Sequence, residues 1–184
     1  MPSLNFKVQG NGYWQLWSSF EGADEAYQCV DDSDTTSHDS GTSYILLPRL
    51  LFELDGVTPA GGRMSFPIMY QCECIPESLT LNVGAREDAA TNPALQIGFW
   101  RSGSAGFHAA PFQPTASYAV ASRTFTTDPI TGAAWTASGL VGLEACVQSA
   151  SGTAGANRIT LLSGSVAYTK ATNAVRPEPV MAVY

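Results

Sequence analysis

The sequence predicts an all-β protein, a single antiparallel β-sandwich of the jelly-roll-like kind with an extended C-terminal arm. Two observations carry this prediction. Apolar and polar residues alternate over several strand-length runs, and clusters of Gly, Pro, Ser and Asp separate these runs. The 17 Gly and 11 Pro of the 184-residue chain suit short strands joined by many turns. No stretch sustains a helical period over three turns, which argues against an α/β enzyme fold.

The first strands are expected near the N-terminus. Residues 3–9 alternate, with Leu4, Phe6 and Val8 on one face, and Asn11-Gly12 then offers a tight turn before the aromatic run 13–17. Because Asn-Gly suits a two-residue turn, this pattern predicts a hairpin.

The longest alternating run covers residues 64–74 and predicts one continuous strand. Pro67 within it indicates an edge position or a bulge. Further strands are expected in runs that begin at Leu79, Leu95, Leu143 and Leu162, with a bulge at Gly164. A short helical turn is expected between Ala134 and Leu143.

The domain is expected to span residues 1–169, followed by an arm over residues 170–184. Pro177 and Pro179 break the alternating pattern and favour an extended backbone. Such an arm can dock on a neighbouring subunit, or it can pack on its own domain. For the docked arm, the predicted partner-binding residues are the apolar ones at its tip: Val180, Met181, Val183 and Tyr184.

The charge of the chain excludes some partners. Its net charge is −7, and Lys7 and Lys170 are its only lysines, so no basic stripe is available to bind nucleic acid or an anionic membrane surface. The N-terminal residues lack the basic and apolar regions of a secretory signal, which predicts a protein made in the cytoplasm. Cys29, Cys72, Cys74 and Cys146 lack zinc-finger spacing and are expected to be packed thiols, with a metal or a bridge between distant strands as the alternative.

An acidic stretch over residues 30–40 is the one candidate metal site. Its carboxylates, Asp31, Asp32, Asp34 and Asp39, are oxygen ligands of the kind that calcium prefers. The Gly and closing Glu of an EF-hand do not fall at their required spacing, however. A solvated acidic loop between two strands is therefore the favoured interpretation.

No catalytic machinery is evident, and we predict that the protein is not an enzyme and needs no cofactor. His38 and His108 are the two histidines, and neither has a nucleophile and an orienting group nearby in the sequence. Trp14, Trp17, Trp100 and Trp135, with Tyr13, could stack on sugar rings if they were exposed together, but sandwich cores use the same residues.

Three segments together resemble a family of small virion-associated proteins of tailed bacteriophages. They are Tyr13-Trp14 with the stretch 26–45, the stretch 128–147 that begins Asp128-Pro129-Ile130-Thr131-Gly132, and the closing strand opened by Arg158-Ile159-Thr160. The resemblance runs from about Gly12 to Tyr168, and residues 55–63 and the C-terminal arm depart from it. It implies a jelly-roll-like sandwich carried on the virus particle, and it transfers no catalytic residue.

The expected function is therefore structural. The resemblance implies a virion protein assembled in the host cytoplasm, either a capsid decoration or cement protein or a component of the neck, tail or fibre. Its expected partners are other virion proteins, and we expect a homo-oligomer, with a trimer as one candidate state. The alternative is a module of the particle that binds host-surface glycans through Trp and Tyr side chains.

Overall fold

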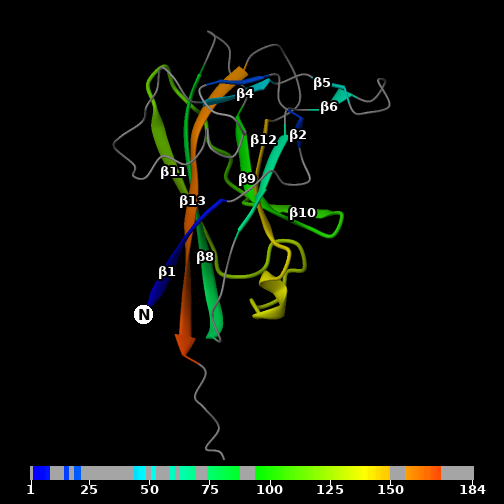
Figure 1. Ribbon diagram of the computed structural model, residues 1–184, viewed down its shortest axis with the longest axis vertical. Coiled ribbons are helices and arrows are strands. Elements are labelled where there is room, and N and C mark those ends of the chain that lie inside the picture. Colours follow the sequence, from blue (N-terminus) through cyan, green and yellow to red (C-terminus); the bar gives the residue numbers. More distant parts are fainter. Residues whose placement is uncertain are drawn as a thin grey trace, which may run out of the picture.

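The computed structural model describes residues 2–8, 15–16, 19–21, 44–48, 51–52, 59–60, 63–68, 74–87, 94–149 and 156–170. The described chain forms two packed antiparallel sheets and a small two-stranded ribbon (Figure 1). The predicted all-β sandwich is confirmed. Within the described ranges no helix is both long and apolar enough to cross a membrane.

The first sheet contains the longest strands. Its order is β11 (Ala119–Phe125), β8 (Cys74–Glu87), β13 (Ala156–Lys170), β4 (Tyr44–Pro48) and β3 (Ser19–Glu21). β1 (Ser3–Lys7) and β4 both pair with the same edge of β13, at different places along it. β1 pairs with Ser163–Ala167, and β4 pairs with Ala156–Ile159.

The second sheet has the order β10 (Ser104–Phe107), β9 (Leu95–Arg101), β12 (Glu144–Ser149), β7 (Arg63–Pro67) and β2 (Gln15–Leu16). The separate ribbon pairs β5 (Leu51–Phe52) with β6 (Pro59–Ala60). A 3-10 helix, η2 (Ser138–Leu140), lies in the connection between β11 and β12, where a helical turn was expected.

The strand order is that of a jelly roll. Eight of the strands make up the jelly roll. In chain order they are β1, β7, β8, β9, β10, β11, β12 and β13. Neighbouring jelly-roll strands in the first sheet are β1, β13, β8 and β11, which are numbers 1, 8, 3 and 6 of this series. In the second sheet they are β7, β12, β9 and β10, which are numbers 2, 7, 4 and 5. This alternation between sheets is the double Greek-key pattern.

The core lies between the inner faces of the two sheets. Alternate residues of β8 point inward, and Leu79, Leu81 and Val83 are fully buried. From the other sheet, Ile97 and Phe99 of β9 and Val147 of β12 meet them in one apolar cluster. The clean two-residue period of these strands is what the alternating sequence runs predict.

Three local predictions are wrong. β1 pairs with β13 and β2 with β7, so these strands belong to different sheets and form no hairpin. The run 64–74 is not one strand, because β7 ends at Pro67 in one sheet and β8 begins at Cys74 in the other. The register shifts of β13 fall between Ile159 and Leu161 and between Ala167 and Tyr168, so Gly164 is not a bulge.

Candidate assembly site at one end of the sandwich

The connection between β11 and β12, residues 126–143, is a turn-rich segment fixed by polar contacts. Asp128 begins a tight turn, since its Oδ1 accepts a hydrogen bond from the Ile130 amide at 2.9 Å and its carbonyl accepts one from the Gly132 amide at 2.7 Å. Gly132 has a φ of 73°, a conformation that favours glycine. The sequence Asp-Pro-x-x-Gly therefore folds into a local loop.

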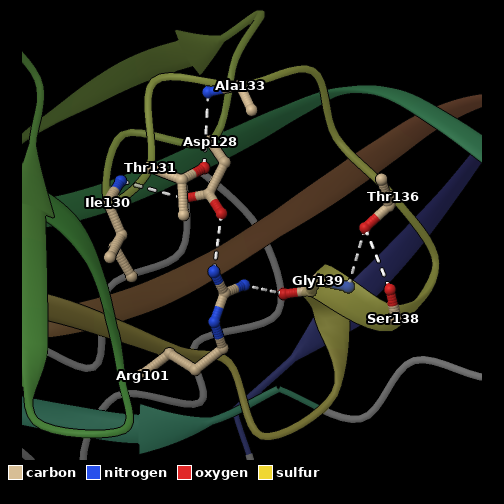
Figure 2. Close-up of polar contacts among 8 residues, drawn as sticks. All are labelled: Arg101, Asp128, Ile130, Thr131, Ala133, Thr136, Ser138 and Gly139. Atoms are coloured by element: carbon tan, nitrogen blue, oxygen red, sulfur yellow. Dashed lines mark hydrogen bonds and ion pairs between the residues drawn. The ribbon is translucent and has the colours of Figure 1, made fainter.

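A partly buried ion pair ties this loop to β9. The Arg101 guanidinium donates to Asp128 Oδ2 at 2.6 Å, and the side chain of Asp128 is 5% exposed (Figure 2). Burial by itself raises the pKa of the Asp128 carboxyl. Hydrogen bonds from Arg101 and from the Ile130 amide, the charge of Arg101 and a hydrogen bond with Thr131 outweigh burial, so the net pKa lies below its ordinary value.

Arg101 also holds the second half of the connection. Another of its guanidinium nitrogens donates to the Gly139 carbonyl, and the Gly139 amide in turn donates to Thr136 Oγ1 at 3.0 Å (Figure 2). One side chain thus bonds both the Asp128 turn and η2. Because Arg presents several donors in a rigid fork, a Lys could not make both contacts with the same geometry.

Two apolar side chains anchor the connection in the core. Trp135 is 4% exposed, and its indole N–H donates to the Phe125 carbonyl at 2.9 Å. Its ring meets Phe99 edge-on, with ring centroids 5.7 Å apart. Leu140 of η2 is 3% exposed. The connection is therefore preorganised by both packing and hydrogen bonds.

This segment presents one large apolar side chain to solvent. Val141 follows η2 and is 74% exposed, and Gly142 beside it has a φ of 68°. The next residue, Leu143, is buried and leads into β12.

Two further exposed apolar side chains lie at the same end of the molecule. Ile75 is 56% exposed near the start of β8, and Leu4 is 38% exposed near the start of β1. Figure 1 shows that the starts of β1 and β8, the end of β13 and the η2 turn share this end. We call Leu4, Ile75 and Val141, the large apolar side chains found exposed among the residues whose burial is described, the apolar end.

The chain leaves the sandwich at the apolar end. Thr169 of β13 pairs with Ile75, Val166 pairs with Leu4, and the Tyr168 amide donates to the Pro2 carbonyl at 3.2 Å. β13 ends at Lys170, immediately before the predicted arm. The predicted anchors Val180, Met181, Val183 and Tyr184 lie outside the described residues.

The predicted metal ligands Asp31, Asp32, Asp34 and Asp39 also lie outside the described residues, as does His38. Within the described part of the chain, no group of three or more His, Cys, Asp or Glu residues could hold a metal ion. Cys146 is a buried free thiol whose pKa is raised by burial and by the charge of Glu144.

His108 has a structural role at the start of the segment after β10. Its Nδ1 accepts a hydrogen bond from the Ala110 amide at 3.1 Å, and its ring meets Phe125 edge-on at 5.5 Å. Of the two described tryptophans, Trp135 belongs to the core and Trp100 is half-buried on β9. Trp14 and Trp17 lie outside the described residues.

The apolar end and the Arg101–Asp128 pair were not identified from the sequence. Isolated exposed apolar residues carry no sequence signal, because Ile75 and Val141 look like core residues of adjoining runs. The Asp-Pro-x-x-Gly turn signature was a usable signal for the loop. In comparisons with known proteins, no protein-family model matches the chain, and no curated protein is significantly similar to it.

Proposed function

We propose that the protein is a bacteriophage virion structural protein that acts by association with neighbouring subunits. The apolar end carries this proposal, because a preorganised segment holds Val141 in solvent at the end of the sandwich where β13 stops at Lys170. Rigid presentation of an apolar side chain lowers the entropy cost of binding a partner.

The fold is compatible with this role. Jelly rolls are common in viral capsid proteins, although they also occur in lectins and in cupin enzymes, so the fold supports the proposal only by analogy. The resemblance of residues 128–147 to phage virion proteins adds support, since these residues form the connection that holds Val141. The proposed partners are other virion proteins, at the capsid surface or at the neck, tail or fibre, after assembly in the host cytoplasm.

The proposed contacts are the apolar end and the arm anchors Val180, Met181, Val183 and Tyr184. Each copy carries a net charge of −7, so electrostatic forces between copies are repulsive at long range, and apolar contacts would have to supply the attraction. The acidic stretch around Asp31 and Asp39 needs no metal in this role.

Quantitative mass spectrometry of purified particles tests the proposal. We expect a fixed copy number per particle that saturates when the protein is in excess. A chain lacking residues 171–184 should bind particles more weakly, and unchanged binding would refute the role of the arm. Absence of the full-length protein from purified particles would refute the virion assignment itself.

The glycan-binding alternative loses Trp135, which is committed to the core, and keeps Trp100 together with Trp14 and Trp17, which lie outside the described residues. Trp100 lies directly across from Glu144 of β12, whose carboxylate accepts a hydrogen bond from Ser65 Oγ, so the aromatic face of Trp100 is the feature that a sugar could stack on. Glycan-array binding that disappears in Trp100→Ala would favour this alternative. The same loss should not follow from changes at the apolar end.

A further inference from the structure

We infer that β1 is an interaction surface for a second copy of the same chain, with the two β1 strands paired side by side across a two-fold axis. This inference rests on the proposed function, association with neighbouring subunits, and names one such neighbour. Its basis is the open backbone edge of β1, the partly exposed apolar side chain on that strand and the pattern of its five residues.

β1 lies at an edge of the first sheet (Figure 1). Its five residues, Ser3–Lys7, pair with β13 on one side, and within the described part of the chain no strand pairs with its other side. The side chains of Ser3, Leu4 and Asn5 are exposed. Backbone N–H and C=O groups along such an edge are available to pair with another strand.

The other described edges are short or already covered. β11 ends the first sheet on its far side, but the Arg123 guanidinium donates to the Ser122 carbonyl of that strand at 3.0 Å and to carbonyls of residues 110–111 at 3.1 Å. A charged side chain held in this way blocks strand addition. On β10, Gly106 lies against the backbone of Pro129. β2, β3 and the strands of the ribbon have two or three residues each.

Leu4 has apolar surface that an added strand would cover. Because side chains alternate along a strand, Leu4 and Phe6 lie on the same face of β1. Phe6 belongs to the core and is 5% exposed, whereas Leu4 is 38% exposed. A strand paired with the open edge places side chains beside Leu4 on that face, so part of this apolar surface leaves water.

The sequence of β1 suits antiparallel pairing with itself. In a pair centred on Asn5, all five residues are matched, and each Asn5 lies opposite the Asn5 of the other copy. Leu4 then lies opposite Phe6, and the one charged residue, Lys7, lies opposite Ser3. A slip of one residue would place apolar side chains opposite polar ones and turn the two sandwiches to opposite faces of the joined sheet.

This contact is closed at two copies. Both partners use the same strand, so the interface is isologous. The first sheets of the two copies become one continuous sheet, with both cores on the same side of it. Main-chain hydrogen bonds supply affinity in strand addition, and the match of alternate side chains fixes the register.

Light scattering coupled to size-exclusion chromatography tests the inference on the purified full-length chain without an N-terminal tag. We expect a dimer. Asn5→Lys and Asn5→Glu should each weaken dimerisation at least about tenfold, because like charges would lie opposite each other at the axis. Asn5 is exposed, so both variants should fold. An equimolar mixture of the two should recover a heterodimer, since opposite charges then meet.

Thr124→Lys and Thr124→Glu are the matched controls. Thr124 is exposed on β11, and it lies in the same cross-strand row as Asn5, which runs through Ser165 and Thr80 to the opposite edge of the sheet. The control variants introduce the same charges into the same sheet away from β1. Both should therefore remain dimers.

A cross-link tests the register. Asn5→Cys should form a disulfide between two copies under mild oxidation, because directly opposite Cα atoms of an antiparallel pair are about 4.5–5.5 Å apart, a separation that a disulfide spans. Wild type under the same oxidation controls for the four natural cysteines. No link beyond that of wild type would overturn the pairing centred on Asn5.

The dimer measurements decide the inference independently of particle binding. A monomeric full-length chain would overturn it, as would a dimer that Asn5→Lys and Asn5→Glu leave unchanged, or a mixture of the two no more dimeric than either alone. A monomer that still saturates particles would leave the virion assignment standing. A dimer that responds to charge at Asn5 but is absent from particles would refute that assignment and retain the pairing of β1.

Discussion

Gly106 of β10 lies directly against the backbone of Pro129. A Cβ at position 106 would be 2.3 Å from both the carbonyl carbon and the carbonyl oxygen of Pro129. Gly98 of β9 makes a similar contact on the other strand of the hairpin, where a Cβ would be 2.1 Å from the Gly106 carbonyl oxygen. Two glycines thus let three backbone segments touch, and the Asp128 turn packs on the β9–β10 hairpin.

Gly106→Ala should therefore lower the free energy of unfolding by about 2 kcal/mol or more, because backbone atoms cannot move aside as a flexible side chain would. Urea denaturation measures the loss, and the near-ultraviolet circular dichroism of the protein, to which buried Trp135 contributes, should change if the connection is displaced. Ser104→Ala, at an exposed position of the same strand, is the control. Equal stability of the two variants would contradict the close contact.

Asp128→Asn should cost about 1–3 kcal/mol of unfolding free energy, because the partly buried Arg101 guanidinium loses its charged partner. The asparagine Oδ1 can still accept from the Ile130 amide, so the local turn should persist. Glu77→Gln, which changes the net charge equally, is the control. A loss no larger than that of the control would show that the pair does not stabilise the fold.

The same pair predicts a pH dependence. The pKa of Asp128 is lower in the folded protein than its ordinary value of 3.8, so the folded state binds its proton less readily than the unfolded state. The stabilisation is therefore present above pH of about 4 and is lost as the pH falls through the folded pKa. Urea titrations between pH 6 and 2.5 should show wild type converging on Asp128→Asn at the acidic end, whereas a constant difference would refute the assignment.

The sequence predicts the core strands better than their pairing. Leu79, Leu81 and Val83 alternate strictly, and the alternation is a local property of one strand. By contrast, β1 pairs with β13, near the other end of the chain. No local sequence pattern distinguishes this pairing from the hairpin that Asn11-Gly12 predicts. β11 escaped prediction because small residues surround its buried Ala121 and Phe125.

The candidate site was less predictable than the fold. Arg101 and Asp128 are 27 residues apart, and a pair made by folding leaves no spacing signal. The exposure of Val141 depends on the turn that holds it. From the sequence alone, a valine close to Leu140 and Leu143 is expected to be a core residue. Sequence reasoning did locate part of the segment, since a helical turn was expected between Ala134 and Leu143, where η2 lies.

Trp135→Phe should lower the unfolding free energy by about 1–3 kcal/mol, because the Phe125 carbonyl loses its indole donor in a buried site. Thermal or urea unfolding measures the change. Trp100→Phe, at a half-buried position, should cost less. Stability of Trp135→Phe equal to wild type would contradict the assignment of Trp135 to the core rather than to a ligand platform.

Gly164→Ala tests why glycine stands in the middle of β13. A Cβ there would lie 2.2 Å from the Thr80 carbonyl oxygen and 2.5 Å from Cζ of Phe6, which packs over Gly164 from β1. We expect a loss of about 2–3 kcal/mol of unfolding free energy, measured by urea denaturation. Ser165→Ala, on the opposite face of the same strand, is the control.

A double-mutant cycle separates the two overlaps at Gly164. Phe6→Leu removes the ring atom nearest to the new methyl group but leaves Thr80 in place, so Gly164→Ala should cost less in the Phe6→Leu background while remaining destabilising. If the cost is the same in both backgrounds, the ring of Phe6 does not occupy the space above Gly164. If no cost appears in either background, the strand tolerates a side chain there, and the close approach of Thr80 and Phe6 does not explain this glycine.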